Sequence, residues 1–422
     1  MENIVITGQR KLSGEISVQG SKNSVLPLLA ATLLVQGESC IENCPDILDT
    51  DAACEILSEL GCKVSRQGSV LTVKNDGDGY MIPEKLMRKM RSSVMFLGAI
   101  LGRCGKAVIS FPGGCELGPR PIDVHIFALK KLGVRFKENG GYLYCDCPEG
   151  LNGCEITLPI QSVGATENLL MAAVKAKGET VINNAAREPE IADLQSFLNK
   201  CGADISGAGS DRIVINGTEK LTGCCHRVIP DRIAAATYII ACALAGDRCK
   251  INNVCPGHIK SIISLLKETN VDLTVDENSV IVLGNRRLFA PRLIRTSFYP
   301  GFPTDAQAIM MSLCCLAKGS SMFIESIFQS RYKHVSELIR MGANIKVEQR
   351  VAVVEGVKNL WGAPVEATDL RGGASLMVAA LAAKGTTVIS KTEHIYRGYE
   401  NPEMVLGSLG ADIKRAKVNE LQ

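Results

Sequence analysis

The chain has 422 residues, of which 46% are hydrophobic and 22% charged, and its formal net charge is +3. This length exceeds one ordinary hydrophobic core, so two domains are expected. The balance of 47 basic and 44 acidic residues excludes a strong overall attraction to nucleic acid. The apolar runs are shorter than a bilayer span, so we expect neither nucleic-acid nor membrane partners.

The N-terminus and the cysteines indicate the compartment. The opening MENIVITGQRKLSG lacks the basic and apolar regions of a signal peptide, so a cytoplasmic location is expected. The 17 cysteines are scattered and odd in number, which favours reduced thiols over a disulfide framework. Pairs such as Cys40–Cys44 and Cys145–Cys147 lack a matching second pair, so no metal and no cofactor are expected.

Two glycine-marked elements recur along the chain. In the first, an apolar helical run, a glycine and a β-like run recur every 66 to 73 residues, at Gly37, Gly105, Gly178, Gly246, Gly319 and Gly385. In the second, a residue suited to the left-handed position after a helix recurs at Gly61, Gly133, Gly202, Asn270, Gly342 and Gly410. Hairpin patterns such as VRFKE-NGG-YLYCD follow the first five of these. The chain therefore reads as six helix-and-sheet copies.

The sixth copy lacks its last strand, and the N-terminus resembles the missing piece. ENIVITGQRKLSG (2–14) matches DRIVINGTEKLTG (211–223). We therefore predict one domain of residues 22–229 and another of residues 1–21 with 230–422. Alanine-rich helices that are apolar nearly all round indicate an α/β fold with helices inside and sheets outside. An open solenoid is disfavoured because no polar capping repeat is present, and a cleft between the domains is the expected ligand site.

The stretch FPGGCELGPRPIDVH (111–125) sets Cys115 apart from the other cysteines. KAVISF predicts a strand and PIDVHIFALKKLG a helix, with the glycine-rich loop between them. Pro121 holds Arg120 extended at the helix start, where backbone N–H groups favour anions. A thiol beside such a positive end gains thiolate character. Ordinary packing is the alternative for Cys115.

Six motifs, spread in order over essentially the whole chain, closely resemble the UDP-N-acetylglucosamine enolpyruvyl transferase family. They are GSKNSVLPLLAATLL, PGGCELGPRPIDVHI, AAREPEIADL, FPTDAQA, ATDLRGGASL and HIYRGYE. The resemblance implies a two-domain inside-out α/β barrel of six βαβαββ-type repeats, three per domain. It also implies transfer of the enolpyruvyl group of phosphoenolpyruvate to the 3′-hydroxyl of UDP-N-acetylglucosamine, with release of phosphate. This is the first committed step of peptidoglycan synthesis.

The resemblance also implies the catalytic residues. Cys115 would donate a proton to carbon and react with the epoxide fosfomycin, and Asp305 would be the base. Lys22, Arg120 and Arg397 would hold phosphoenolpyruvate. Asn23 would face both substrates, and Asp369 would lie at the chemical centre. From the residues alone, Lys22 and Arg397 could be solvated, and Asp305 could be a first-turn helix acid after a Thr304 cap.

Further substrate contacts follow from the same motifs. Arg91 would contact the nucleotide sugar, and two segments would cradle the uridine diphosphate: Arg120, Pro121, Ile122, Asp123 and Val124, and Ser162, Val163 and Gly164. Ile327 and Phe328 would contact the sugar side, with core packing as the alternative. Arg331 and Arg371 would add cations to the cleft. Because these residues come from both halves, domain closure is expected.

Some residues of the chain depart from the family pattern, and three other functions are alternatives. Glu116, Gly372-Gly373 and Asn401-Pro402 differ from common family choices. Enolpyruvyl-shikimate-phosphate synthase shares the fold and chemistry but lacks an equivalent cysteine loop. An RNA-end cyclase is disfavoured by the balanced charge and the 5% aromatic content. A non-catalytic regulator that binds nucleotide sugar would not need a carbon acid.

Overall fold

The computed structural model describes residues 2–111, 122–284 and 287–417. They divide into two compact units. The first unit comprises the described residues of 20–229, and the second comprises residues 2–19 and the described residues from 230 onward. The described residues of each unit form three separate four-stranded sheets, as the six predicted copies require.

In the first unit the sheet orders are β14-β3-β5-β4, β6-β7-β9-β8 and β10-β11-β13-β12. Its strands are β3 (Glu38–Glu42), β4 (Cys62–Gln67), β5 (Val70–Asn75), β6 (Met81–Ile82), β7 (Lys106–Ser110), β8 (Arg135–Asn139), β9 (Tyr142–Asp146), β10 (Glu155–Thr157), β11 (Glu179–Asn183), β12 (Asp204–Ser206), β13 (Arg212–Asn216) and β14 (Cys225–Arg227). Its α-helices are α1 (Lys22–Ala31), α2 (Leu48–Glu59), α3 (Glu84–Met87), α4 (Phe96–Cys104), α5 (Asp123–Lys131), α6 (Val163–Ala173) and α7 (Pro189–Lys200). Two 3-10 helices, η1 (Thr32–Leu34) and η2 (Arg91–Met95), adjoin α1 and α4.

In the second unit the orders are β22-β23-β1-β24, β16-β17-β15-β2 and β18-β19-β21-β20. Its strands are β1 (Glu2–Thr7), β2 (Leu12–Ser17), β15 (Gly246–Asn252), β16 (Asp272–Val275), β17 (Ser279–Leu283), β18 (Leu293–Arg295), β19 (Ser320–Ile324), β20 (Asn344–Glu348), β21 (Val351–Glu355), β22 (Pro364–Glu366), β23 (Thr386–Ser390) and β24 (Asp412–Lys417). Its helices are α8 (Arg232–Ala245), η3 (Pro256–Ile259), α9 (Lys260–Glu268), α10 (Thr304–Cys314), α11 (Val335–Arg340), α12 (Leu370–Ala382), α13 (Glu393–Tyr396) and α14 (Pro402–Ser408).

Each unit is built around long helices that are buried along nearly their whole length. In the first unit α4 packs on α6 and α1, and in the second α10 packs on α12 and α8. Residues 371–381 of α12 are all buried. Strands such as β21 instead alternate between buried and exposed positions, as a sheet with one solvated face does. The predicted inside-out α/β arrangement is confirmed, although the sheets of the described residues do not join into one closed barrel.

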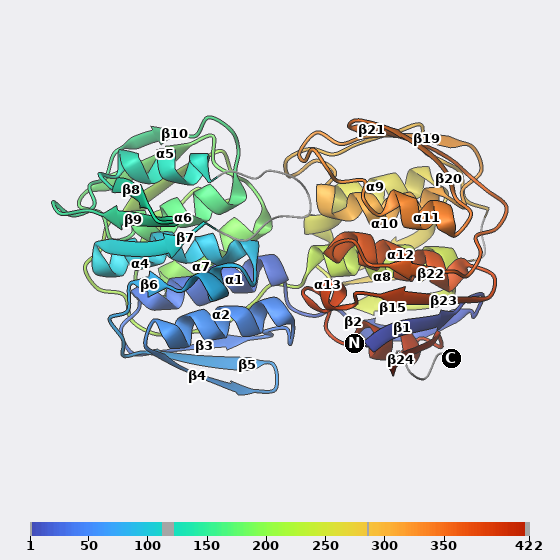
Figure 1. Ribbon diagram of the computed structural model, residues 1–422, viewed down its shortest axis with the longest axis horizontal. Helices are drawn as coiled ribbons and strands as arrows, with labels where there is room; N and C mark the ends of the chain where they lie inside the picture. The colour runs from blue at the N-terminus through green and yellow to red at the C-terminus, as the bar shows by residue number, and fades with distance from the viewer. Residues whose placement is uncertain (1, 112–121, 285–286, 418–422) are drawn as a thin grey trace. The chain divides into compact units, whose positions relative to one another are not determined.

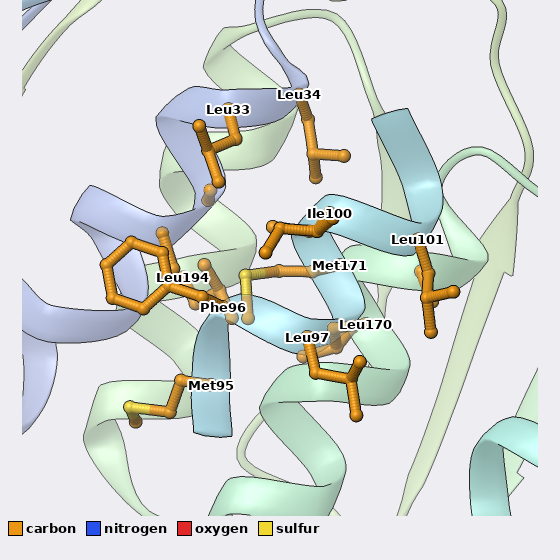
Figure 2. Close-up of a cluster of buried hydrophobic side chains, with 14 of the residues drawn as sticks. Leu33, Leu34, Met95, Phe96, Leu97, Ile100, Leu101, Leu170, Met171 and Leu194 are labelled. Atoms are coloured by element: carbon orange, nitrogen blue, oxygen red, sulfur yellow. The ribbon is translucent and has the colours of Figure 1, made fainter. Parts of the chain in front are cut away.

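The core of the first unit shows why these helices are apolar on every side. Phe96, Leu97 and Ile100 of α4 belong to one buried apolar cluster with residues of α6 and with Leu33 of η1 (Figure 2). All four side chains are fully buried. A helix packed on several faces needs apolar residues all round, which explains the alanine- and leucine-rich runs of the sequence.

The predicted turns form as expected. Gly140 and Gly141 join β8 to β9, and the flanking Asn139 and Tyr142 are paired in register. Both glycines have positive φ, 59° and 80°, as a two-residue hairpin turn requires. The six residues predicted to follow helices also have positive φ, between 68° and 105°.

The N-terminal strand completes the last copy. β1 pairs antiparallel with both β23 and β24, with Ile4 opposite Ile389 and Arg415. The three strands lie side by side in the second unit (Figure 1). This pairing confirms that the start of the chain supplies the strand missing from its end.

Candidate active site

In three of the buried helices, α1, α6 and α10, the residues that are not buried lie in the first turn. Asn23 is the one residue of α1 that is not buried. In α6 the exceptions are Val163 and Gly164, and in α10 they are Thr304 and Asp305. First turns carry free N–H groups and a partial positive charge, which favour anions. Four of these five residues are among the predicted site residues.

The second unit brings Asp305, Arg331 and Arg371 into direct contact. Arg331 Nη2 lies 3.1 Å from Asp305 Oδ1, and Arg371 Nη2 lies 3.2 Å from Asp305 Oδ2. The two arginine side chains are only 2% and 3% exposed, whereas Asp305 is 28% exposed. Each carboxylate oxygen is therefore engaged by a buried cation while the group stays open to a ligand.

The charges around Asp305 determine its protonation. Burial raises the pKa of the carboxyl, but Arg371, Arg331 and Arg232 together outweigh burial and hold it well below its usual range. The carboxylate is therefore ionised at neutral pH and is a weak base in this arrangement. It would become a stronger base if an anion drew the guanidinium groups away.

Tyr399 and Asp369 hold Arg371 in place. Arg371 Nη1 donates to Tyr399 Oη at 3.2 Å, and that oxygen lies 2.8 Å from Thr237 Oγ1. Asp369 Oδ1 accepts from the backbone N–H groups of Arg371 and Gly372 at 3.0 and 3.1 Å. Asp369 is thus the N-cap of α12. Burial raises the pKa of this carboxyl, but Arg331 and the capping N–H groups lower it by more. The pKa of Asp369 therefore lies below its usual value.

Glu325 organises the segment that contains Ile327 and Phe328. Its Oε1 accepts from both of their backbone N–H groups, at 2.9 and 3.0 Å. Its Oε2 accepts from Thr304 Oγ1 at 3.0 Å. Thr304 therefore does not cap α10, as the alternative interpretation of Asp305 required: Pro303 is the N-cap, and the Thr304 hydroxyl is bonded to Glu325 instead.

Gln19 secures the segment around Arg397. Its Nε2 donates to Gly398 O at 3.1 Å, and its Oε1 accepts from Glu400 N at 2.8 Å. Arg397 itself ends α13 and is half-buried. Within the second unit, Gln19 from the start of the chain therefore positions the segment of Arg397, which is predicted to bind phosphoenolpyruvate and lies near the end of the chain.

The departures from family patterns have local explanations. A side chain at Gly373 would press on Ile395 at 2.6 Å, and one at Gly372 would press on Thr368 at 2.8 Å. The two glycines thus allow close packing beneath Arg371. Asn401 has a positive φ of 40°, which asparagine tolerates, and its Oδ1 accepts from Arg415 Nη2 at 3.0 Å.

In the first unit Lys22 is paired and buried. It is the first residue of α1, which Ser21 caps by accepting from Ser24 N at 3.3 Å. Lys22 Nζ lies 2.8 Å from Asp49 Oδ2, and both side chains are under 10% exposed. The alternative of a solvated loop lysine is therefore wrong. A buried pair of this kind fixes the direction of the ammonium group.

Asn168 joins the segments predicted to cradle the nucleotide. Its Nδ2 lies 2.9 Å from His125 Nδ1 and donates to Val94 O and Gly164 O at 3.1 and 3.3 Å. Its Oδ1 accepts from Gly98 N at 2.5 Å. The fully buried side chain of Asn168 thus links four segments: η2, α4, the first turn of α5 and the start of α6.

The predicted residues are located as follows. Cys115, Arg120 and Pro121, and also Glu116, lie outside the described residues. Ile122 precedes α5, and its first two residues are Asp123 and Val124. Ser162 caps α6 by accepting from Ala165 N at 3.3 Å. Arg91 begins η2 and is half-buried.

In the described part of the chain, no three or more His, Cys, Asp or Glu side chains are arranged to hold a metal ion. The helices of that part are all too short or too polar to cross a bilayer.

Comparison with known proteins identifies the family. Residues 6–406 match the family model described as EPSP synthase (3-phosphoshikimate 1-carboxyvinyltransferase). UDP-N-acetylglucosamine 1-carboxyvinyltransferase 2 of Caldanaerobacter subterraneus is 49% identical, over 98% of this chain and all of the relative. The chain belongs to the enolpyruvyl (carboxyvinyl) transferase family. The corresponding Endomicrobium trichonymphae protein is 46% identical over 98% of this chain and 99% of its own length.

Solved structures of enolpyruvyl transferases have the same fold. The enolpyruvyl transferase NikO from Streptomyces tendae aligns with a TM-score of 0.90 and 26% identity, over 98% of this chain and 99% of that one. An EPSP synthase from Acinetobacter baumannii aligns with a TM-score of 0.75 and 18% identity, over 99% and 100%. The second likeness bears on the fold alone.

Proposed function

We propose that this enolpyruvyl transferase uses phosphoenolpyruvate and UDP-N-acetylglucosamine, and so carries out the first committed step of peptidoglycan synthesis. The observation that carries the proposal is identity of 44–49% over nearly the whole chain to relatives named for that activity. A shikimate phosphate acceptor has less support, because the EPSP synthase structures are only 18–19% identical.

The chemistry assigns a role to each group. The sugar hydroxyl oxygen adds to C2 of phosphoenolpyruvate while C3 gains a proton. Phosphate then leaves as C3 loses a proton, and the enol ether forms. We infer that Cys115 supplies the proton to C3 and that Asp305 accepts the hydroxyl proton. Lys22, Arg120 and Arg397 would hold the anionic phosphoenolpyruvate.

The geometry at Asp305 supports a substrate-triggered base. Arg331 and Arg371 engage both carboxylate oxygens of Asp305. A phosphate or carboxylate group of the substrate would compete for the same guanidinium groups. As they turn toward the substrate, the pKa of Asp305 would rise and its basicity would increase. Asp369 would serve by keeping Arg371 at the start of α12.

We further propose that the two units are the catalytic domains and that the enzyme acts in the cytoplasm, without nucleic-acid or membrane partners. Both substrates are small and multiply charged. The paired and half-buried cations around the first turns suit such anions.

Phosphate release distinguishes the possible acceptors. The full-length protein is incubated with phosphoenolpyruvate and either UDP-N-acetylglucosamine or shikimate 3-phosphate. We expect release with the nucleotide sugar alone. Release with shikimate phosphate alone would overturn the assignment, and release with neither would favour a regulatory binding protein.

Fosfomycin labelling tests the assignment of Cys115. Wild-type protein should gain one adduct, and Cys115→Ser should gain none. Cys225→Ser is the matched control, since Cys225 is an exposed thiol of the first unit; this variant should label like the wild type. Labelling that persists in Cys115→Ser would show that another thiol reacts.

A further inference from the structure

Two thiols in the first unit lie in contact outside the proposed active site. The sulfur atoms of Cys201 and Cys224 are 3.4 Å apart. Cys201 ends α7, and Cys224 directly precedes β14. A disulfide bond is about 2.05 Å long, so the two atoms would need to approach by about 1.4 Å. Side-chain rotation supplies movement on this scale.

The main chain holds both cysteines next to each other. Cys201 O accepts from Thr222 N at 2.8 Å, and Cys224 O accepts from Cys40 N at 2.9 Å. A second tie joins the same elements, because His226 Nε2 of β14 lies 2.8 Å from Asp193 Oδ1 of α7. The two thiols therefore belong to a part of the fold that is already fixed, and their closeness does not depend on an isolated loop.

The two thiols differ in access and charge. Cys201 is 1% exposed, whereas Cys224 is half-buried. Burial raises the pKa of both thiols, and at Cys224 the nearby Lys200 ammonium opposes that rise. Lys200 is fixed nearby, with its Nζ 3.3 Å from His226 Nδ1. Cys224 is therefore the thiol that an external reagent meets first.

We propose that Cys201 and Cys224 form a site of reversible disulfide modification. The Cys224 thiolate attacks a low-molecular-weight disulfide, forms a mixed disulfide and releases one thiolate. Cys201 then loses its proton to solvent, attacks the Cys224 sulfur and displaces the second thiolate. Two protein thiols are oxidised as the reagent disulfide is reduced to two thiols.

The bond would add a covalent tie between α7 and β14. Asp193 of α7 also accepts a hydrogen bond from Ser24 Oγ in the first turn of α1. That turn contains Lys22 and Asn23. The crosslink would restrict the unfolded chain and strengthen the α7–β14 contact on which this turn rests.

Peptide mapping tests the proposal independently of catalytic activity. Full-length protein is treated with oxidised glutathione, blocked with N-ethylmaleimide and digested with trypsin. Cleavage after Lys200, Arg212, Lys220 and Arg227 separates peptide 201–212 from peptide 221–227. We expect these two peptides to be joined and to separate again on reduction.

Cys225→Ser is the matched control, because it leaves Cys224 as the one cysteine of peptide 221–227. The link should persist in this variant and vanish in Cys201→Ser and Cys224→Ser. The oxidised wild type should melt roughly 4 °C or more above the reduced protein, and this difference should be lost in Cys201→Ser. A glutathione adduct that stays on Cys224, a link through Cys225, or no link would each overturn the proposal.

Discussion

Asp305 is held between two arginines, which makes its charge the feature to test at the scale of single residues. In Asp305→Asn the isosteric amide oxygen can accept from only one of the two arginines, and the NH2 group faces the N–H donors of the other. Because the new side chain has the same shape and the position is 28% exposed, the fold should persist. Loss of a positioned base should lower kcat by about 10²–10⁴-fold. Steady-state phosphate release measures this change.

The control for Asp305→Asn is Glu366→Gln, which removes a carboxylate from an exposed ion pair with Lys391 in the same unit. This variant should keep kcat within about twofold, since such pairs contribute little. A kcat of Asp305→Asn that also stays within threefold of wild type would rule out a role for the carboxylate in proton transfer.

His334 makes stability depend on pH. Its ring is fully buried, and neither ring nitrogen has a hydrogen-bond partner among the described residues. Burial lowers its pKa from 6.5 to about 4, although Asp369 partly opposes the shift. Between these values the unfolded chain binds more protons than the folded one. The free energy of unfolding should therefore fall as pH is lowered from 6.5 to 4, by up to ~1.4 kcal/mol per pH unit.

Urea unfolding between pH 4.5 and 7.5 measures this dependence. His334→Leu removes the titrating group from its buried position, so its stability should decline less steeply than that of the wild type over this range. Equal slopes for the two proteins would show that His334 does not cause the effect.

At the scale of elements, the sequence predicted the pattern of secondary structure because that pattern is local and repeated. The glycines after helices, the β8–β9 turn and the pairing of β1 all follow from motifs in the chain. The alternative that Thr304 caps α10 is wrong because its hydroxyl group donates to Glu325, 21 residues away. An N-cap inferred from neighbouring residues takes no account of a hydrogen-bond partner that lies far along the chain.

Residues that hold the site from a distance were missed for the same reason. Gln19 bonds to a segment 379 residues further along, and Asp49 meets Lys22 from another helix. Tyr399 lies inside the motif HIYRGYE, and Asn168 lies four residues after Gly164 of a predicted site segment. The sequence therefore placed both residues near the site, but only packing shows which partners they bond to. The resemblance predicts which residues face the substrates, but it does not predict the residues that support them.

Asn168 offers a test of such a support. In Asn168→Ala the buried Gly98 N–H and the carbonyls of Val94 and Gly164 lose their partner, which should lower the free energy of unfolding by ~1–3 kcal/mol. Since the linked segments are those predicted to bind the nucleotide, the KM for UDP-N-acetylglucosamine should rise about tenfold, equivalent to ~1.4 kcal/mol. The KM for phosphoenolpyruvate should change much less.

Asn199→Ala provides the matched control. Asn199 also makes two backbone hydrogen bonds in the first unit, to Ile205 N at 3.0 Å and Ile205 O at 2.8 Å, but it supports none of the predicted nucleotide segments. Its loss should lower stability without changing either KM. Equal rises of both KM values in Asn168→Ala would indicate general damage rather than positioning.

At the scale of the whole molecule, the residues predicted to bind the nucleotide sugar are divided between the two units. Arg91 and residues 162–164 belong to the first unit, whereas Asp305 and Ile327 belong to the second. A ligand that needs both sets must hold them together while it is bound. The nucleotide sugar is the larger substrate and is predicted to contact both, so we expect its binding to drive closure.

Small-angle scattering measures this change. The radius of gyration should fall when UDP-N-acetylglucosamine is added, and phosphoenolpyruvate alone should have a smaller effect. Arg91→Ala removes one predicted contact of the first unit, so closure should require a higher concentration of nucleotide sugar, whereas Asn199→Ala should behave like the wild type. A scattering profile that both substrates together leave unchanged would contradict closure. In that case the predicted binding residues would act in an unchanged domain arrangement. Residues that are far apart along the chain can bind one substrate without any domain movement.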